Sequence, residues 1–430
     1  MNAEKLTTPK EKVRELQRKL YQSAKRNKVR KFHALYDKLY REDILYEAWK
    51  RVRANDGSAG IDNQTIEEVE AYGVDKIIEE IQEILRENNY NPPPVRRIYI
   101  PKADGSERPL GIPTVKDRII QSAMKLMIEP VLEADFKDCS YGFRPKRNQH
   151  QALEVIRKAC NNRGNYVLDG DIKGYFNNIN HEKLMMLVER RISDRRINKL
   201  ILKWLKAGIM EKGKYEDSTI GSPQGGVISP LLANLYLDYL DTIWERHYRH
   251  LGKLIRFADD FIIVCKNYKD VSNSFTAIKM IMKRLELELN MEKTKIVNLW
   301  EGKDGFVFLG MEIRKVKMHR INGTKYYATD MWVCKKKQKV IKERVKETLK
   351  DATLYQSIEE MITRLNRKIV GWRGYYHISN KRILIKLDKY ILMRLVYWYN
   401  RKKQKPKRYH YSERMDLFRN IGLKRIAFVS

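Results

Sequence analysis

The stretch RFADDFIIVC, Arg256 to Cys265, sets two adjacent aspartates between apolar runs. LIRF before them and FIIVC after them predict two short buried strands joined by a tight turn. Neighbouring carboxylates repel one another, so at the edge of a packed sheet they need solvent, a proton or a cation. Hard oxygen ligands suit Mg²⁺. The stretch therefore predicts a hairpin that presents Asp259 and Asp260 to a divalent ion, with an Asx-type turn in solvent as the ordinary alternative.

A third carboxylate follows another predicted strand. The segment VLDGDIKGYF places Asp171 at the end of an apolar run. Phosphoryl transfer to a 3′-hydroxyl uses two metal ions roughly 4 Å apart. Three aspartates from two adjacent strands can hold such a pair, so we expect Asp171, Asp259 and Asp260 to bind two Mg²⁺ ions.

The charge balance indicates the kind of partner. The 430 residues include 87 Lys and Arg against 54 Asp and Glu, a formal charge of +33. A long polyanion is the natural partner of such a chain, and nucleic acid is favoured over a membrane surface because no polybasic amphipathic segment stands out. The sequence shows no Cys pair, apolar leader or membrane-spanning run, so we expect reducing bacterial cytoplasm, associated with RNA or the nucleoid. His247 and His250, three residues apart, are interpreted as a polar helix face.

Periodicity predicts three regions, of which the middle one is an α/β or α+β layer structure. Thr8-Pro9 begins a basic helical N-terminal extension over 1–55. Strands and helices alternate through 56–320, where NPPPVRRIYIPKADGSERPLGIPT predicts a β-hairpin and FVFLGMEI an apolar strand. After about Arg320 the pattern becomes helical, and 321–430 is expected to form a separate helical module with a basic tail.

Several of these segments together resemble a known family. DIKGYF, SPQGGVISPLLANLYL, RFADDF, LNMEKTKI and FVFLG, in that order, are similar to the palm motifs of reverse transcriptases. RIYIPK…RPLGIPT and SYGFRP resemble the fingers segments of the group II intron branch, and LNRKIVGWRGYYHISN resembles its maturase, or thumb, domain. The family usually has Tyr where Phe257 stands and often an acidic residue where Asn177 stands. The resemblance implies a right-hand polymerase fold with fingers, palm and an all-helical thumb/maturase (X) domain.

The resemblance also implies roles for the acidic and basic site residues. Asp171 and Asp259 would be the main metal ligands, with Asp260 as the accessory member. Lys293 matches a proposed general acid for pyrophosphate, although Lys295 is close by. The remaining implied contacts are Lys102 and Arg108 to the triphosphate, Phe176 as the steric gate against a 2′-hydroxyl, Gln224 beneath the incoming nucleotide, and Phe308, Leu309 and Gly310 as the primer grip.

The leading hypothesis is thus an RNA-directed DNA polymerase of group II intron type that also binds intron RNA and assists splicing and mobility. Its partners would be an RNA template, a DNA or RNA primer and dNTPs, and no membrane. One alternative is a free-standing reverse transcriptase recruited to phage defence or a CRISPR locus. Another is a catalytically silent RNA-binding maturase, which the three intact aspartates disfavour. Oligomeric state and priming mode stay open.

Overall fold

The computed structural model describes residues 8–101, 105, 107–211, 214–216, 220–221, 225–407 and 410–427. The chain divides into two compact units, each built from several segments. The first unit comprises residues 1–148, 170–263 and 272–295, and the second comprises residues 149–169, 264–271 and 296–430. The boundary falls within strands β3 (Tyr166–Gly170) and β7 (Asp260–Cys265). The three-region division expected from the sequence stays a prediction.

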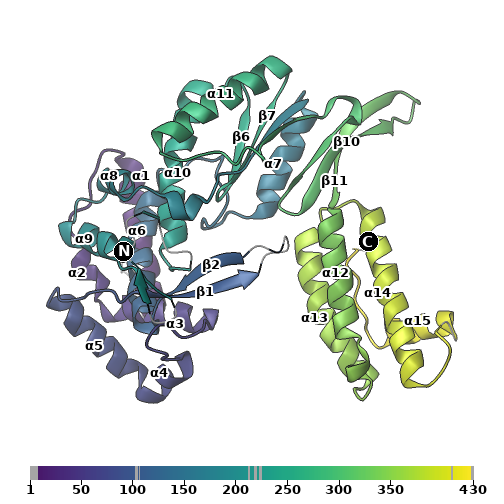
Figure 1. Cartoon of the computed structure of the whole chain (residues 1–430), viewed down its shortest axis with the longest axis horizontal. Coiled ribbons are helices and arrows are strands. Elements are labelled where there is room, and N and C mark those ends of the chain that lie inside the picture. The colour runs from purple at the N-terminus through teal and green to yellow at the C-terminus, as the bar shows by residue number, and fades with distance from the viewer. Residues whose placement is uncertain are drawn as a thin grey trace, which may run out of the picture. The chain divides into compact units, whose positions relative to one another are not determined.

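Helices α1, α3 and α6 lie side by side in the first unit (Figure 1). Helix α1 begins as predicted: Thr8 is the N-cap, Pro9 opens the first turn, and Thr8 and Glu11 form a capping box. Most of α6 is buried because helices surround it. The helices of this unit are α1 (Pro9–Arg26), α2 (Tyr36–Leu39), α3 (Glu42–Asn55), α4 (Ile66–Tyr72), α5 (Val74–Arg86), α6 (Val115–Glu133), α8 (His181–Glu189), α9 (Arg195–Leu205), α10 (Ser229–Ile243) and, from Ser272 on, α11 (Tyr268–Arg284), with the short turns η1 (Tyr175–Asn178) and η2 (Trp244–Tyr248).

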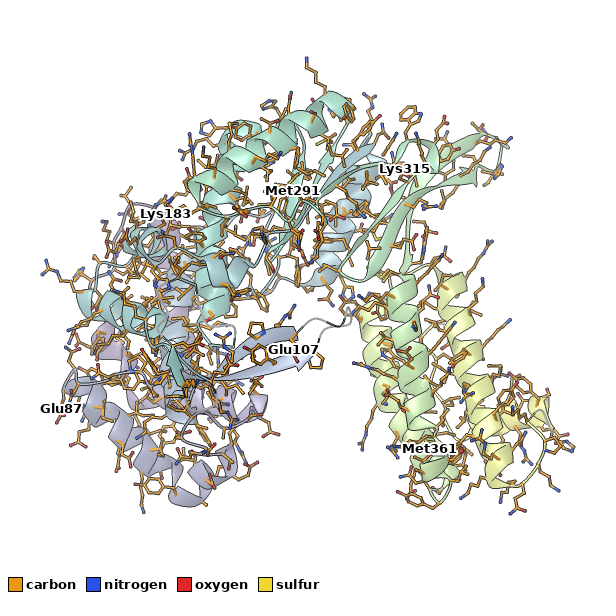
Figure 2. The ribbon with its side chains drawn as sticks, viewed as in Figure 1. Glu87, Glu107, Lys183, Met291, Lys315 and Met361 are labelled. Carbon is orange, nitrogen blue, oxygen red and sulfur yellow. The ribbon has the colours of Figure 1, made fainter. Side chains whose placement is uncertain are left out.

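The first unit contains the two hairpins that the sequence predicts. Strands β1 (Val95–Pro101) and β2 (Glu107–Ile112) pair antiparallel, with Ile98 opposite Leu110, and Glu107 lies near the hairpin tip (Figure 2). Strands β4 (Ile209–Glu211) and β5 (Lys214–Glu216) complete a sheet of order β2-β1-β4-β5. Strand β6 (Lys253–Phe257) is the hydrogen-bonded neighbour of β7. The RFADD stretch is therefore the turn of a real hairpin.

The second unit combines a three-stranded antiparallel sheet, of order β11-β10-β9, with a helical bundle (Figure 1). Helix α7 (Gln149–Asn161) packs against β11, and β3 pairs with β8 (Lys295–Asn298). The other elements are η3 (Trp300–Gly302), β9 (Gly305–Phe308), β10 (Met311–His319), β11 (Lys325–Val333), α12 (Lys335–Thr348), η4 (Asp351–Thr353), α13 (Ile358–Tyr376), α14 (Lys381–Lys402) and α15 (Tyr411–Asn420).

Two local expectations are wrong. FVFLGMEI is not one strand but two, because Leu309 and Gly310 have φ values of 49° and 75° and turn the chain between β9 and β10. Helix does not follow Arg320 directly: β11 extends the sheet first, and the helices begin at Lys335. Within the described ranges, no helix is long and apolar enough to cross a bilayer.

Candidate active site

A buried arginine holds the turn that carries the two aspartates. Arg256 lies in β6 and is 1% exposed. Its guanidinium donates to both Asp241 carboxylate oxygens, to Asn234 Oδ1 at 3.0 Å and to the Ala258 carbonyl at 2.8 Å. Burial disfavours the charge of Arg256, yet its pKa is raised because the Asp241 carboxylate more than offsets that effect.

Ala258 needs such support. Its φ of 59° lies in the left-handed region, which a hairpin turn of this kind normally fills with glycine. A non-glycine residue there costs on the order of 1–3 kcal/mol, so the surrounding contacts must hold it. The Ala258 carbonyl accepts from Arg256, and the backbone of Gly142 lies against the Ala258 amide, where a Cβ on residue 142 would come within 2.4 Å. The turn geometry is therefore imposed by its surroundings.

A second glycine allows the end of β3 to approach β7. A Cβ on Gly170 would lie 2.2 Å from the Phe261 ring, so only glycine permits this contact. Asp171 follows immediately and is one-quarter exposed. The negative charge of Asp171 acts on Asp259, which places the two carboxyl groups within electrostatic range of each other.

The electrostatic environment of Asp259 disfavours its negative charge. Burial raises the pKa of Asp259, and the Asp171 charge raises it further, whereas Arg108 and Arg256 oppose the shift. Two carboxyl groups in this situation are stabilised by a bound cation. Arg108, at the start of β2, thus lies where its charge reaches the site.

The loop after α11 clamps Asp171. The Asp171 carbonyl accepts from the Asn290 amide at 2.8 Å, and the Asp171 amide donates to Thr294 Oγ1 at 3.3 Å. Between these contacts, Lys293 Nζ lies 3.3 Å from Asp171 Oδ2. Lys293 is about two-thirds exposed, so the ion pair adds little stability. It does place an ammonium beside the predicted metal ligand.

Phe176 lies in η1, directly after the Asp171 segment. Its ring meets Tyr175 edge-on, and the hydroxyl of Tyr175 donates to the Ala233 carbonyl. Gly221 packs on the backbone of residues 176 and 177, and its carbonyl lies 2.5 Å from His181 Nε2. Lys102 and Gln224 lie outside the described residues, so their roles stay predictions.

The predicted primer grip belongs to the second unit. Phe308 is buried, while Leu309 and Gly310 form the β9–β10 turn. The Leu309 carbonyl accepts from the Tyr375 hydroxyl at 3.0 Å, and the Gly310 carbonyl accepts from the Cys334 amide at 3.1 Å. Helix α13 therefore fixes the position of this turn.

The residues of the site fit a divalent cation in part. Asp171 and Asp259 supply hard oxygen ligands in a setting that disfavours the negative charge of Asp259. Asp260, the first residue of β7, is exposed. In the part of the chain that the structure describes, no group of three or more His, Cys, Asp and Glu side chains converges as a metal site. The arrangement of three carboxylates stays a prediction.

Sequence reasoning missed the residues that support the site. Arg256, Asp241 and Asn234 form a buried polar network, and Asn290 and Thr294 hold Asp171. One signal was available: an arginine in the otherwise apolar strand LIRF requires a buried partner. Nothing in the spacing pointed to which helix would supply that partner.

Comparisons with known proteins find two family models that match this chain. The family model described as reverse transcriptase (RNA-dependent DNA polymerase) matches residues 100–313, and the group II intron, maturase-specific domain matches residues 338–415. Protein YkfC of Escherichia coli (strain K12) is 38% identical over 267 residues, covering 54% of this chain and 69% of YkfC. The group II intron-encoded protein LtrA of Lactococcus lactis subsp. cremoris is 37% identical over 276 residues, covering 63% of this chain but only 44% of LtrA.

A solved structure of apo telomerase from Candida tropicalis, truncated from its C-terminal domain, aligns at 15% identity with a TM-score of 0.40, covering 57% of this chain and 58% of that one.

The two family models and the similarity to YkfC show that the chain belongs to the group II intron reverse transcriptase/maturase family. The family resemblance and the α+β fold class expected from the sequence are thereby confirmed.

Proposed function

We propose that this protein is an active RNA-directed DNA polymerase that extends a primer 3′-hydroxyl with dNTPs. The observation that carries the proposal is the convergence of Asp171 and the Asp259 turn, held by buried Arg256 and by the Asn290–Thr294 loop. A family member that had become a silent maturase would have no need to retain a strained turn with a buried support.

Each residue of the site has a distinct task. Asp171 and Asp259, with Asp260 as the accessory member, would hold two Mg²⁺ ions. When bound, the ions would acidify the primer hydroxyl and neutralise charge on the departing pyrophosphate. Lys293, whose ammonium lies beside Asp171, would give a proton to pyrophosphate. Arg108, together with the predicted contact from Lys102, would bind the triphosphate.

The nucleotide and the primer would be positioned by the remaining predicted contacts. Phe176 would lie against the sugar and exclude a 2′-hydroxyl, so that the product is DNA. Gln224 would lie beneath the incoming nucleotide. The Phe308–Gly310 turn, fixed by α13, would grip the primer strand.

The template is proposed to be RNA, including group II intron RNA. The match of the maturase-specific domain over residues 338–415 and the formal charge of +33 support binding of intron RNA and assistance of splicing. The chain spans less than half of the length of LtrA, so the activities of the whole LtrA protein are not assigned to this chain.

The test is primer extension on an RNA template with Mg²⁺, using Asp171→Ala, Asp259→Ala and the control Asp304→Ala, an exposed aspartate of the second unit. We expect both site variants to lose extension and keep RNA binding, while the control retains both. Normal extension by either site variant would show that the catalytic centre is elsewhere. Lack of extension by the unchanged protein, with RNA binding intact, would favour the silent maturase.

A further inference from the structure

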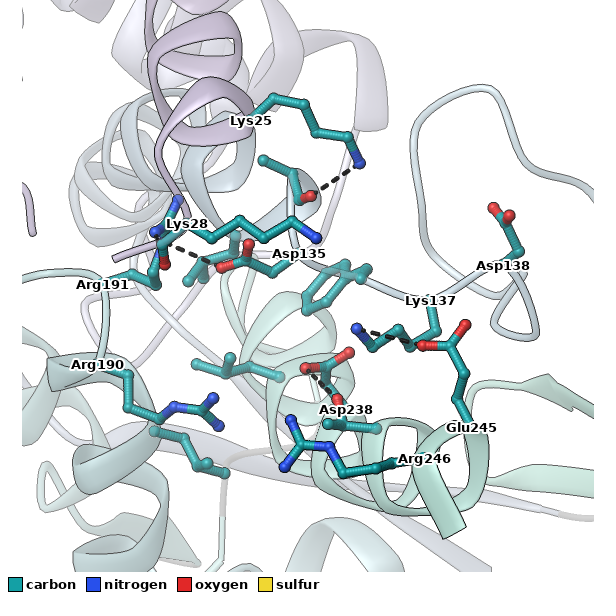
Figure 3. A pocket seen from close by; sticks show the side chains of 16 residues that line it. Lys25, Lys28, Asp135, Lys137, Asp138, Arg190, Arg191, Asp238, Glu245 and Arg246 are labelled. Carbon is teal, nitrogen blue, oxygen red and sulfur yellow. Dashed lines mark hydrogen bonds and ion pairs between the residues drawn. The ribbon is translucent and has the colours of Figure 1, made fainter. Parts of the chain in front are cut away.

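A cavity of about 510 Å³ lies in the first unit, apart from the residues assigned to catalysis (Figure 3). Its walls come from the C-terminal end of α1, the segment after α6, the end of α8, and helix α10 with η2. Leu132, Phe136, Leu187 and Leu235 give it an apolar side. This volume falls within the range of small-molecule sites, roughly 300–1,000 Å³.

Most acidic groups of the cavity already have partners. Asp135 pairs with Arg191 at 2.9 Å, Glu245 pairs with Lys137 at 3.5 Å, and Asp138 pairs with Arg147 outside the cavity. The cationic side chains of the cavity, in contrast, are not all paired. Among the described residues, the side chains of Lys28, Arg190 and Arg246 have no ion pair or hydrogen bond, and Figure 3 shows all three at the cavity wall. The cavity therefore presents three cations without a direct ion pair, although the charge of Arg190 also acts on Asp135.

One carboxyl group in the cavity is incompletely bonded. Asp238, on α10, accepts from the Thr242 hydroxyl at 3.4 Å through Oδ2, while its buried Oδ1 has no hydrogen-bond partner among the described residues. Burial, and then the charge of Asp241, raises the pKa of Asp238 to about 7. A buried polar atom without a partner costs on the order of 1–3 kcal/mol, which a rotation of the Asp238 side chain toward a donor bound in the cavity would recover.

These observations together define a ligand with an anionic end and a hydrogen-bond donor. We propose that the cavity binds a nucleoside monophosphate unit, free or as an unpaired nucleotide of RNA, with its phosphate on Lys28, Arg190 and Arg246 and a base amino group on Asp238. Carboxylates recognise the amino group of cytosine in this way, and the apolar wall suits the face of a base. Inorganic phosphate alone would leave Asp238 and most of the cavity unused.

The site goes beyond the proposed polymerisation, since none of its lining residues is assigned to that reaction. The test is equilibrium binding of CMP, UMP and inorganic phosphate to the full chain and to Arg246→Gln and Asp238→Ala variants. Arg249→Gln is the matched control, because Arg249 is also exposed at the end of η2 but does not line the cavity.

We expect CMP to bind more tightly than UMP or phosphate, Arg246→Gln to weaken CMP binding about tenfold, as for loss of one charge-assisted contact, and Arg249→Gln to leave it unchanged. Asp238→Ala, which removes the acceptor oxygens, should remove the preference for CMP over UMP. Equal affinity for CMP, UMP and phosphate, or equal effects of the two arginine variants, would overturn the proposal.

A cytidine hexanucleotide separates the two sources of the ligand. Competition with CMP that depends on Arg246 would assign the site to unpaired RNA, and binding of CMP alone would assign it to free nucleotides. The Asp171→Ala variant tests the polymerase proposal and the cavity proposal separately. It should abolish primer extension without changing the affinity for CMP.

Discussion

Replacing Asp241 with asparagine tests whether the buried Arg256–Asp241 pair holds the site. The two side chains are 1% and 0% exposed, so the variant leaves a buried guanidinium without its counter-charge. Breaking such a pair costs about 3–5 kcal/mol, a large part of the roughly 5–15 kcal/mol that stabilises a typical protein. We expect the free energy of unfolding to fall by that amount.

The same variant should slow catalysis. Without Asp241, Arg256 is no longer oriented toward the Ala258 carbonyl, and the turn can leave its left-handed conformation. Loss of one charge-assisted hydrogen bond, about 1.5–3 kcal/mol, corresponds to roughly a 10- to 100-fold lower kcat. Urea unfolding measures the first effect, and steady-state primer extension, with RNA binding followed in parallel, measures the second.

Two further variants make this prediction sharp. Asp416→Asn removes an exposed carboxylate that pairs with Arg419 at 3.0 Å, and should cost less than about 1 kcal/mol. The double variant Arg256→Met with Asp241→Leu removes both buried charges, so it should recover stability but not kcat. The reasoning fails if Asp241→Asn is no more harmful than Asp416→Asn, or if the double variant regains full activity.

Three other predictions address single side chains. Phe176→Ala should admit ribonucleotides, and unchanged dNTP preference in extension assays would remove its assigned role; Phe275→Ala is the control. Lys293→Ala should lower kcat about 10²-fold with little change in the dNTP KM; an equal effect of Lys295→Ala would contradict this. Burial raises the pKa of Asp238 from 3.8 to about 7, so its destabilising effect grows between those pH values. Asp238→Asn should therefore be more stable than the parent at pH 8, by about 4 kcal/mol at most, and equal at pH 4, as measured by urea unfolding.

Local signals in the sequence predicted local structure well. The Thr8-Pro9 start of α1 and the RFADD hairpin both rest on short-range chemistry, and both are confirmed. The β9–β10 turn was missed because Leu309 adopts a positive φ, and an apolar residue in the sequence does not indicate that conformation. Strand β11 was missed because its first residues are exposed and are mostly polar or aromatic.

The sequence predicted the acidic residues of the candidate site but not the residues that hold them in position. Acidic residues after apolar strands indicated a metal site, and the structure brings Asp171 near Asp259. The contacts that hold them join residues far apart in the chain, such as Asp171 with Asn290 and Thr294. Such contacts depend on how whole elements pack, which no short pattern in a single sequence encodes.

The position of α6 has a consequence for the N-terminal helices. Gln17 and Lys25 of α1 donate to the carbonyls of Leu126, within α6, and Ala134, just after its end, and α3 packs on the same helix. Removing the first helix would uncover apolar side chains and strip two backbone oxygens of their donors. Helix α1 therefore belongs to the same cooperative folding unit as α6. A shortened chain that begins after α1 would be prone to aggregate, even with all its catalytic residues present.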